Sequence, residues 1–184
     1  MSGRKVFLLL PKPLNGIPSL IAGKSHMIGD IAGPPTLAHK GSREGVFVAE
    51  VIAGKQPHPI NYGNIPSVTY CHPEVASIGL TEEQCKEQEL EYVIGRFPLS
   101  ANGRARASLE TDGFVKIIRD SRYGEILGAH VVASHASELI HELAVARENE
   151  YTVEEIELAV HAHPTLSEAV AEAALDSLGR VMHT

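Results

Sequence analysis

Residues 114–133 read "FVKIIRDSRYGEILGAHVVA", and this stretch decides the fold class. In "FVKIIRD" apolar side chains alternate with polar ones, which is the period of a β-strand with one buried face. "EILGAHVVA" reads as a second strand, and "SRYG" (121–124) is a turn between the two. Two strands joined by so short a turn run antiparallel, so we predict a β-hairpin.

Further strands are predicted before this hairpin. "SVTYCH" (67–72) and "EVASIGL" (74–80) are β-branched or alternating, and Pro73 marks a turn between them. "EYVIGRFPL" (91–99) also reads as a strand. "SANGRARASLETDG" (100–113) is polar and is predicted to be a loop.

Helices are predicted where the apolar period lengthens. Thr81 and Gln84 have the spacing of a capping box, so a short helix begins there, and Thr152 and Glu155 repeat that spacing. From residue 134 on, the pattern is helical. Strands followed by helices are the order of an α+β domain, so we predict a mainly antiparallel sheet flanked by helices.

The N-terminal third has a different character. Residues 1–26 combine prolines and glycines with little periodicity and are not placed. "MIGDI" (27–31) looks like a strand end, so Asp30 is predicted at a strand exit, a common position for a ligand-contacting residue. A helix is predicted over 36–52, ended by Gly54.

A domain boundary is predicted between these parts. "KQPHPINYGNIP" (55–66) is rich in Pro, Gly and Asn. Such a composition is typical of exposed linkers between folded parts. We therefore divide the chain into residues 1–60 and residues 61–184.

Charge and length argue against several kinds of partner. The 184 residues contain 16 Lys+Arg against 23 Asp+Glu, a formal net charge of -7. Because there is no basic block, we expect no nucleic-acid or membrane partner. The apolar run at residues 6–10 is too short for a signal peptide, and no stretch approaches the roughly 20 apolar residues that span a bilayer. We expect a cytoplasmic protein.

The two cysteines, Cys71 and Cys85, fit a reducing compartment. They form no close pair, and no disulfide-rich pattern exists. No second pair is available to complete a structural metal site with them. Cys71 is predicted to be a buried strand thiol.

The stretch "HAHPTLSEA" (161–169) carries a candidate acid–base pair. His163 precedes a proline, which favours extended backbone. Glu168 has two interpretations. It can complete a capping box with Thr165 at the start of a final helix over about 165–178. Its carboxylate can instead accept the ring N–H of His163, fix the tautomer and raise the basicity of the ring. The spacing alone leaves both interpretations open.

The same stretch allows two further sites. In an extended segment His161 points to the same side as His163, and two such histidines can bind a metal. No further ligand is spaced nearby, so no metal is predicted. Ser167, a histidine and an acid (Glu142 or Glu168) are the parts of a nucleophilic triad. A serine hydrolase is kept as the weaker alternative, because Ser167 lies in the predicted first helical turn without a glycine elbow.

Several stretches in the same order resemble the flavin-dependent pyridine nucleotide–disulfide oxidoreductases. "HAHPTLSEA" is similar to the C-terminal signature of the dihydrolipoamide dehydrogenases within that family. The resemblance covers about residues 27–184. The other stretches are "IGDIAGPPTLAHKGSREG" (28–45), "IPSVTYCHPEVASIGLTEEQ" (65–84), "FPLSANGRARA" (97–107) and "GEILGAHVVASHASELIHELA" (124–144).

The resemblance implies a dimerisation domain preceded by a remnant of an FAD-binding domain. It implies that His163 is the base that deprotonates a dihydrolipoamide thiol and that Glu168 is its orienting carboxylate, since a thiolate rather than a thiol attacks a disulfide. It further implies contacts with FAD at Asp30 and at the start of the predicted helix, by Thr36, Leu37, Ala38 and His39.

The resemblance also implies an activity and partners. The parent reaction is the oxidation of dihydrolipoamide by NAD+ through FAD and a redox disulfide. The parent enzyme is a homodimer in which His163 serves the other subunit, and it works with the lipoyl-bearing components of 2-oxo acid dehydrogenase complexes.

These 184 residues depart from the family in one respect. The family's glycine-rich nucleotide-binding motif and its closely spaced redox cysteines are not among them. We therefore expect the chain to supply the interface and the His–Glu pair, to bind no FAD or NAD by itself, and to be inactive alone. A stand-alone dimerisation module without catalysis is the alternative.

Overall fold

The computed structural model describes residues 19–20 and 25–183. The chain forms two compact units, Met1–Tyr62 and Gly63–Thr184. The division falls inside the Pro- and Gly-rich stretch 55–66. Residues 1–18 and 21–24, which the sequence did not place, lie outside the described residues.

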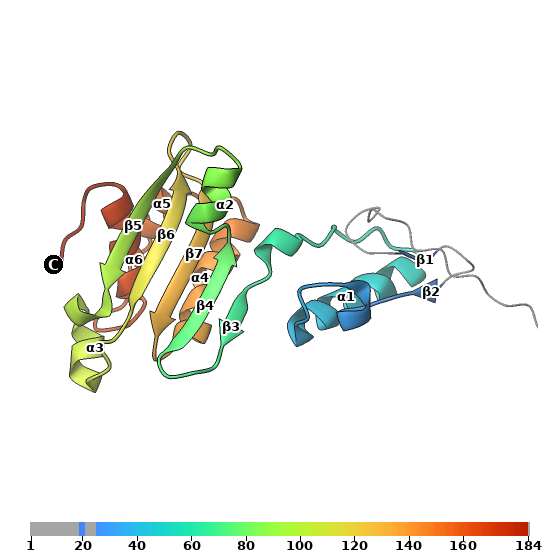
Figure 1. The fold of residues 1–184 in the computed structure, drawn as a ribbon, viewed down its shortest axis with the longest axis horizontal. Helices are drawn as coiled ribbons and strands as arrows, with labels where there is room; N and C mark the ends of the chain where they lie inside the picture. The colour runs from blue at the N-terminus through green and yellow to red at the C-terminus, as the bar shows by residue number, and fades with distance from the viewer. Residues whose placement is uncertain (1–18, 21–24, 184) are drawn as a thin grey trace, which may run out of the picture. The chain divides into compact units, whose positions relative to one another are not determined.

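The first unit is built around one long helix (Figure 1). Its two short strands pair antiparallel. The long helix begins two residues later than predicted, and Gly54 follows its end with a left-handed φ of 78°. The elements are β1 (Ser19–Leu20), β2 (Ser25–His26), the 3-10 helix η1 (Gly29–Ala32) and α1 (Ala38–Ile52), with the 3-10 helix η2 (Tyr62–Asn64) at the boundary between the units.

The predicted strand end at residues 27–31 is wrong. β2 ends at His26, and Asp30 lies in η1. Gly29 and Gly33 adopt φ values of 70° and 111°, which a strand does not contain. The ammonium group of Lys40 donates to the carbonyl oxygens of Gly29 (2.8 Å) and Gly33 (2.6 Å), and these bonds hold the turn.

The second unit is an α+β domain, as predicted. None of the helices in the described part of the chain is long and apolar enough to cross a membrane. The elements are β3 (Ser67–Thr69), β4 (Glu74–Gly79), α2 (Glu82–Glu87), β5 (Tyr92–Pro98), the 3-10 helix η3 (Leu99–Ala101), α3 (Gly103–Ser108), β6 (Phe114–Asp120), β7 (Ile126–Ala133), α4 (Ala136–Glu148), α5 (Val153–Leu158) and α6 (Glu168–Ser177).

The sheet has five antiparallel strands in the order β3-β4-β7-β6-β5. The predicted hairpin is confirmed: β6 pairs with β7, with Phe114 opposite Val132. Both predicted capping boxes are also present, at the start of α2 and of α5. The local signals for this hairpin and for the starts of α2 and α5 were therefore correct.

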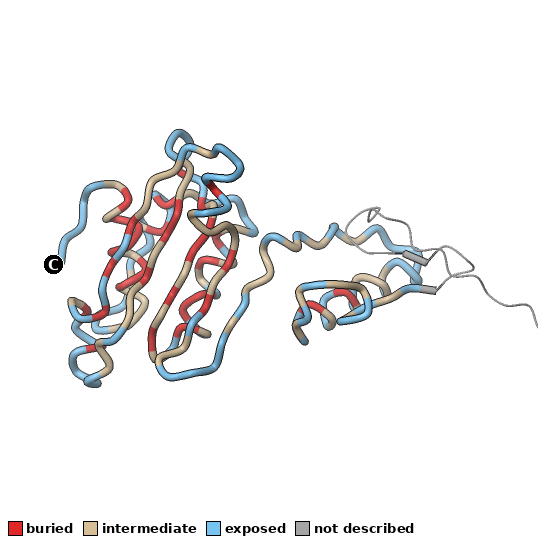
Figure 2. The backbone as a smooth tube through the Cα atoms, viewed as in Figure 1, coloured by how far each residue is buried: buried red, intermediate tan, exposed pale blue. Residues whose placement is uncertain are grey.

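The hydrophobic core lies between one face of the sheet and the helices. α6 packs on β5 and β6, and α4 packs on β7 and β4 (Figure 1). Buried residues alternate along the strands and line the inner sides of the helices (Figure 2). Each fully buried Val, Leu or Ile side chain contributes about 1.5–3 kcal/mol. The core includes Val115, Ile117, Ala129, Val131, Leu139, Ile140, Leu143, Ala169, Val170 and Ala173.

Two predictions for this unit are wrong. The polar stretch 100–113 is not simply a loop. It contains the end of η3 and the whole of α3, whose N-cap is Asn102. Cys71 is exposed rather than buried, since β3 already ends at Thr69. Its thiol donates to the carbonyl oxygen of Pro73 (3.1 Å).

Gly95 sets the distance between β5 and α6. A Cβ atom at this position would lie 1.9 Å from the carbonyl oxygen of Ala173 and 2.6 Å from the backbone nitrogen of Ser177. Only a residue without a side chain allows the helix so close to the strand. α6 carries Glu168, so Gly95 also determines where this carboxylate lies.

Gly95→Ala should therefore destabilise the second unit by about 1–3 kcal/mol or more, because backbone rather than a flexible side chain must move. Gly103→Ala is the matched control. A Cβ there meets no atom within 4 Å, so the substitution should be neutral or stabilising by about 0.4–1 kcal/mol. Urea unfolding at one fixed protein concentration measures both. Equal stabilities would contradict this account of Gly95.

Candidate functional site

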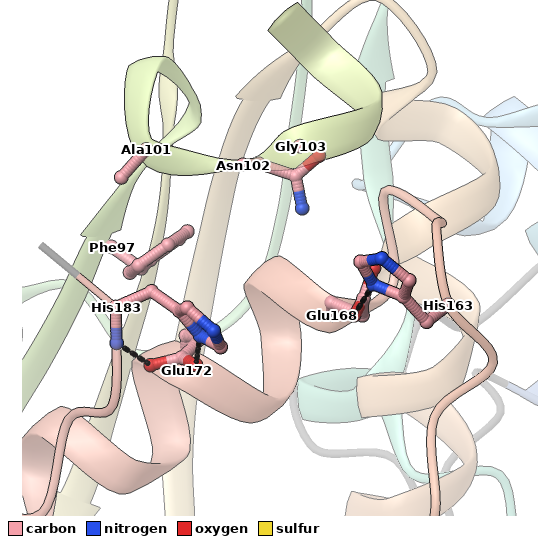
Figure 3. A pocket seen from close by; sticks show the side chains of 8 residues that line it. All are labelled: Phe97, Ala101, Asn102, Gly103, His163, Glu168, Glu172 and His183. Atoms are coloured by element: carbon pink, nitrogen blue, oxygen red, sulfur yellow. Dashed lines mark hydrogen bonds and ion pairs between the residues drawn. The ribbon is translucent and has the colours of Figure 1, made fainter. Parts of the chain in front are cut away.

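The connector of residues 159–167, between α5 and α6, carries the predicted acid–base histidine. His163 precedes Pro164 through a cis peptide bond. Its side chain is 77 % exposed, while that of Glu168 is 25 % exposed. The ring nitrogen Nδ1 of His163 lies 2.8 Å from Oε1 of Glu168 (Figure 3). The structure thus brings the two predicted residues into direct contact.

Glu168 also fulfils half of the predicted capping box. Its Oε2 accepts the backbone N–H of Thr165 at 2.8 Å. The other half is absent, because the Thr165 hydroxyl donates to the carbonyl oxygen of Ala162 (2.7 Å). α6 accordingly begins at Glu168 with Ser167 as its N-cap, and the predicted start at Thr165 is wrong. One oxygen of the carboxylate therefore makes the predicted contact with His163, while the other makes only the glutamate half of the predicted capping box.

The electrostatics favour the ionised form of Glu168. Burial alone raises the pKa of this carboxyl, but the Thr165 N–H and the His163 ring together outweigh burial and hold the pKa below its usual value. An ionised carboxylate only accepts hydrogen bonds. The Nδ1 atom of His163 therefore carries a proton, and in the neutral ring Nε2 is left with the lone pair of a base.

A small cavity of about 160 Å³ opens beside this pair. Figure 3 shows side chains from β5, η3, α3 and α6 around it, together with His183 near the C-terminus. The cavity is the space in which a small reacting group can approach the pair. It is lined by Phe97, Ala101, Asn102, Gly103, His163, Glu168, Glu172 and His183.

Glu172 holds the C-terminal residues beside the cavity. It is 4 % exposed and lies one turn after Glu168. One oxygen accepts the backbone N–H groups of Met182 (3.0 Å) and His183 (3.3 Å), and the other contacts Nδ1 of His183. Sequence reasoning missed this residue. Its signal was an acid among the buried alanines of α6.

His161 faces a different partner from His163. Its Nε2 lies 2.7 Å from Oε1 of Glu142 on α4, and its Nδ1 lies 2.8 Å from the carbonyl oxygen of Ala159. The two histidines therefore do not converge on one point. Among residues 19–20 and 25–183, no group of three or more His, Cys, Asp or Glu side chains is placed to hold a metal. In the same residues, no hydrogen bond joins the Ser167 hydroxyl to a histidine, so a triad at Ser167 gains no support.

The residues predicted to contact FAD lie in the first unit. Asp30 is exposed in η1, and Thr36, Ala38 and His39 are exposed at the start of α1. Leu37, which is partly buried, is the N-cap of α1 and makes no side-chain capping bond. The first backbone N–H groups of a helix have no partner within it, and they favour electron-rich ligand atoms. The residues predicted to contact FAD therefore lie together in η1 and at the start of α1.

A buried ion pair in α1 fixes the turn of residues 29–33 that precedes this helix. Lys40 and Glu44 are 2 % and 0 % exposed, and their charged groups lie 3.3 Å apart. Glu44 accepts the N–H of Gly29 (2.6 Å) and the hydroxyl of Tyr62 (2.7 Å). Burial and the nearby carboxylate raise the pKa of Tyr62, so this hydroxyl remains a donor. Through these bonds α1 holds the turn that carries Asp30.

Comparison with known proteins identifies the family of this chain. Residues 65–174 match the family described as "Pyridine nucleotide-disulphide oxidoreductase, dimerisation domain". The chain belongs to this family. The predicted resemblance is thereby confirmed, and so is the α+β fold of the oxidoreductase domain.

The relatives of this oxidoreductase domain include proteins named dihydrolipoyl dehydrogenase. The protein from Zymomonas mobilis is 50 % identical over 157 residues, which are 85 % of this chain and 34 % of that protein. The protein from Rhizobium etli is 48 % identical over 159 residues, 86 % of this chain and 33 % of that protein. The chain spans about a third of the length of these relatives.

Solved structures agree in fold with this chain. LpdA from Mycobacterium tuberculosis aligns with a TM-score of 0.83 and 29 % identity, covering 91 % of this chain and 37 % of that one. The HOCl-induced flavoprotein disulfide reductase RclA from Escherichia coli shares the fold, with a TM-score of 0.75 and 20 % identity over 88 % of this chain and 39 % of that one.

The lowered pKa of Glu168 predicts a dependence of stability on pH. Because the pKa is lower in the folded chain than its ordinary value of 4.5, ionised Glu168 stabilises the fold above about that value. The stabilisation is lost as the pH falls through the lowered pKa. Between about pH 5 and pH 3, the parent chain should lose more unfolding free energy than Glu168→Gln, which cannot ionise.

Urea unfolding at a series of pH values measures this difference. Glu89→Gln, at an exposed glutamate after α2, is the control and should follow the parent chain. An identical acid dependence in Glu168→Gln and the parent chain would show that the contacts of Glu168 do not favour its ionised form.

Proposed function

We propose that this chain is the C-terminal part of a dihydrolipoyl dehydrogenase and that His163 and Glu168 are its acid–base pair. The observation that carries the proposal is the 2.8 Å contact between His163 Nδ1 and Glu168 Oε1 beside a cavity. The names of relatives such as those from Zymomonas mobilis and Arabidopsis thaliana, at 50 % and 44 % identity, support the reaction that we propose. That reaction is the oxidation of dihydrolipoamide by NAD+.

His163 acts as a general base in this proposal. Its Nε2 accepts the proton of a dihydrolipoamide thiol, and the resulting thiolate is the nucleophile that attacks a disulfide. Glu168 keeps the other ring nitrogen protonated and stabilises the imidazolium that forms. Because the His163 ring is 77 % exposed, it is open to a substrate and to an active site on another subunit.

FAD and NAD belong to the whole enzyme in this proposal. FAD supplies the two-electron transfer between the disulfide and NAD+ when it is bound. Asp30 and the start of α1 would hold one edge of it, through the carboxylate and the first backbone N–H groups. The two cysteines of this chain have thirteen residues between them in sequence, with Cys85 buried and Cys71 exposed. They do not form the redox pair.

A homodimer is the proposed assembly, with lipoyl-bearing components of 2-oxo acid dehydrogenase complexes as partners of the whole enzyme in the cytoplasm. Two apolar side chains next to the histidines support an interface there. Val160 is 100 % exposed and Leu158 is 74 % exposed. Exposed apolar residues that adjoin a functional segment are typical of interaction surfaces. A stand-alone dimerisation module without catalysis is the second candidate, supported by the same surface.

A chimera tests the proposed base. Residues 63–184 replace the corresponding part of the Zymomonas mobilis enzyme, which is 50 % identical to this chain over 157 residues. The chimera should reduce NAD+ with dihydrolipoamide. His163→Gln in the chimera should lower kcat by about 10²–10⁴-fold, the usual contribution of a general base.

His72→Gln is the matched control, since His72 is also an exposed histidine directly before a proline. It should leave kcat unchanged. The 184-residue chain alone should show neither NADH formation nor bound-flavin absorbance. Full activity of the His163→Gln chimera would contradict the proposed base, and activity of the chain alone would contradict the predicted dependence on the rest of the enzyme.

The homodimer is tested with the 184-residue chain itself. Light scattering should give a mass of twice 19.8 kDa. Val160→Asp places a charge on the proposed interface and should shift the chain toward the monomer, because burying an unpaired charge is costly. Glu89→Asp, on an exposed turn, is the control. A monomeric parent chain at high micromolar concentration would contradict the dimer.

A further inference from the structure

Asn102 is a buried polar residue beside the site. Both polar atoms of its side chain have hydrogen-bond partners. It is 3 % exposed and is the N-cap of α3. Its Oδ1 accepts the backbone N–H of Ala105 at 2.9 Å, and its Nδ2 donates to the carbonyl oxygen of Thr165 at 3.0 Å. The second bond joins residues 63 positions apart in the sequence.

The bond to Thr165 reaches the segment that carries the base. Thr165 follows His163 by two residues and precedes Glu168 by three. Its carbonyl oxygen is bound by Asn102, and its N–H is bound by Glu168. The backbone of Thr165 is therefore held from two sides, by α3 and by α6. Figure 3 shows Asn102 across the cavity from His163 and Glu168.

We propose that Asn102 is a positioning residue for the acid–base pair, because it ties the connector of His163 to the start of α3. Its importance for catalysis rests on the proposed function of His163. Its effect on the geometry of Glu168 does not, because the hydrogen bonds are made within this chain. Asn102 donates to the carbonyl oxygen of Thr165 and so fixes this part of the backbone. In this position the N–H of Thr165 points at the carboxylate of Glu168.

An amide is the side chain that meets both requirements. The N-cap needs an acceptor, and the Thr165 carbonyl needs a donor. Serine caps a helix well, but its hydroxyl is too short to reach a second partner at this distance. Aspartate also caps well, but it directs a carboxylate oxygen at the Thr165 carbonyl, where two acceptors face each other. Both variants keep the cap and remove the bond to the connector.

The test measures Glu168 by NMR in the 184-residue chain, without any enzyme assay. In Asn102→Ser and Asn102→Asp, the pKa of Glu168 from its side-chain carboxyl carbon should rise toward the ordinary value, since its bond to the Thr165 N–H loosens. The Thr165 amide should lose on the order of tenfold protection against hydrogen exchange, as expected for the net loss of one hydrogen bond. The Ala105 amide should remain protected, because the cap is kept.

Asn64→Asp is the matched control. Asn64 also donates from Nδ2 to a backbone carbonyl, that of Ala144 (3.1 Å), but it lies in η2 and does not contact the connector. It should leave Glu168 and Thr165 unchanged. An unaltered Glu168 pKa and Thr165 protection in both Asn102 variants would overturn the proposal, even where activity of the chimera confirms His163 as the base. A changed Glu168 pKa and a changed Thr165 protection in the 184-residue variants would uphold the positioning role of Asn102. They would do so even if the chimera were inactive and the proposed function failed.

Discussion

The carboxylate of Glu168 binds the ring of His163 with one oxygen and the backbone of Thr165 with the other, and the site depends on this double contact. The contact needs α6 at a particular distance from the sheet, which Gly95 permits by bringing β5 against the backbone of Ala173. The packing of the second unit thus determines where the carboxylate of Glu168 lies. A sheet packed on helices places one carboxylate at the start of a helix, where it fixes a histidine on the preceding connector.

The charges around this carboxylate explain how an exposed histidine can have a defined tautomer. Burial of Glu168 opposes its ionisation, but two hydrogen bonds to the charged form more than compensate and lower its pKa. Because an ionised carboxylate cannot donate, Nδ1 of His163 holds the proton and Nε2 is the basic nitrogen. Fixed hydrogen bonds on one side of the ring leave Nε2 as the nitrogen that accepts a proton in the proposed function.

Local signals predicted much of the second unit. The alternation at 114–133 and the capping boxes at Thr81 and Thr152 act over a few residues, so they could be read directly and were correct. The start of α6 was missed because the Thr165 hydroxyl binds Ala162 instead of capping the helix. The resemblance to a family, rather than spacing, gave Glu168 its role as partner of His163. The bond from Asn102 to Thr165 spans 63 residues, and no pattern within a short window reveals it. The turn at Asp30 was also missed, because Lys40 stabilises it from the next helix through bonds to two backbone carbonyl oxygens.

The central claim is that Glu168 fixes His163 as a base with its proton on Nδ1. Nitrogen NMR of the His163 ring, at a pH where the ring is neutral, tests it most directly. The account predicts a protonated Nδ1 and an unprotonated Nε2 in the parent chain, with the preference lost in Glu168→Gln. A neutral ring with its proton on Nε2, or the same tautomer in both chains, would contradict it.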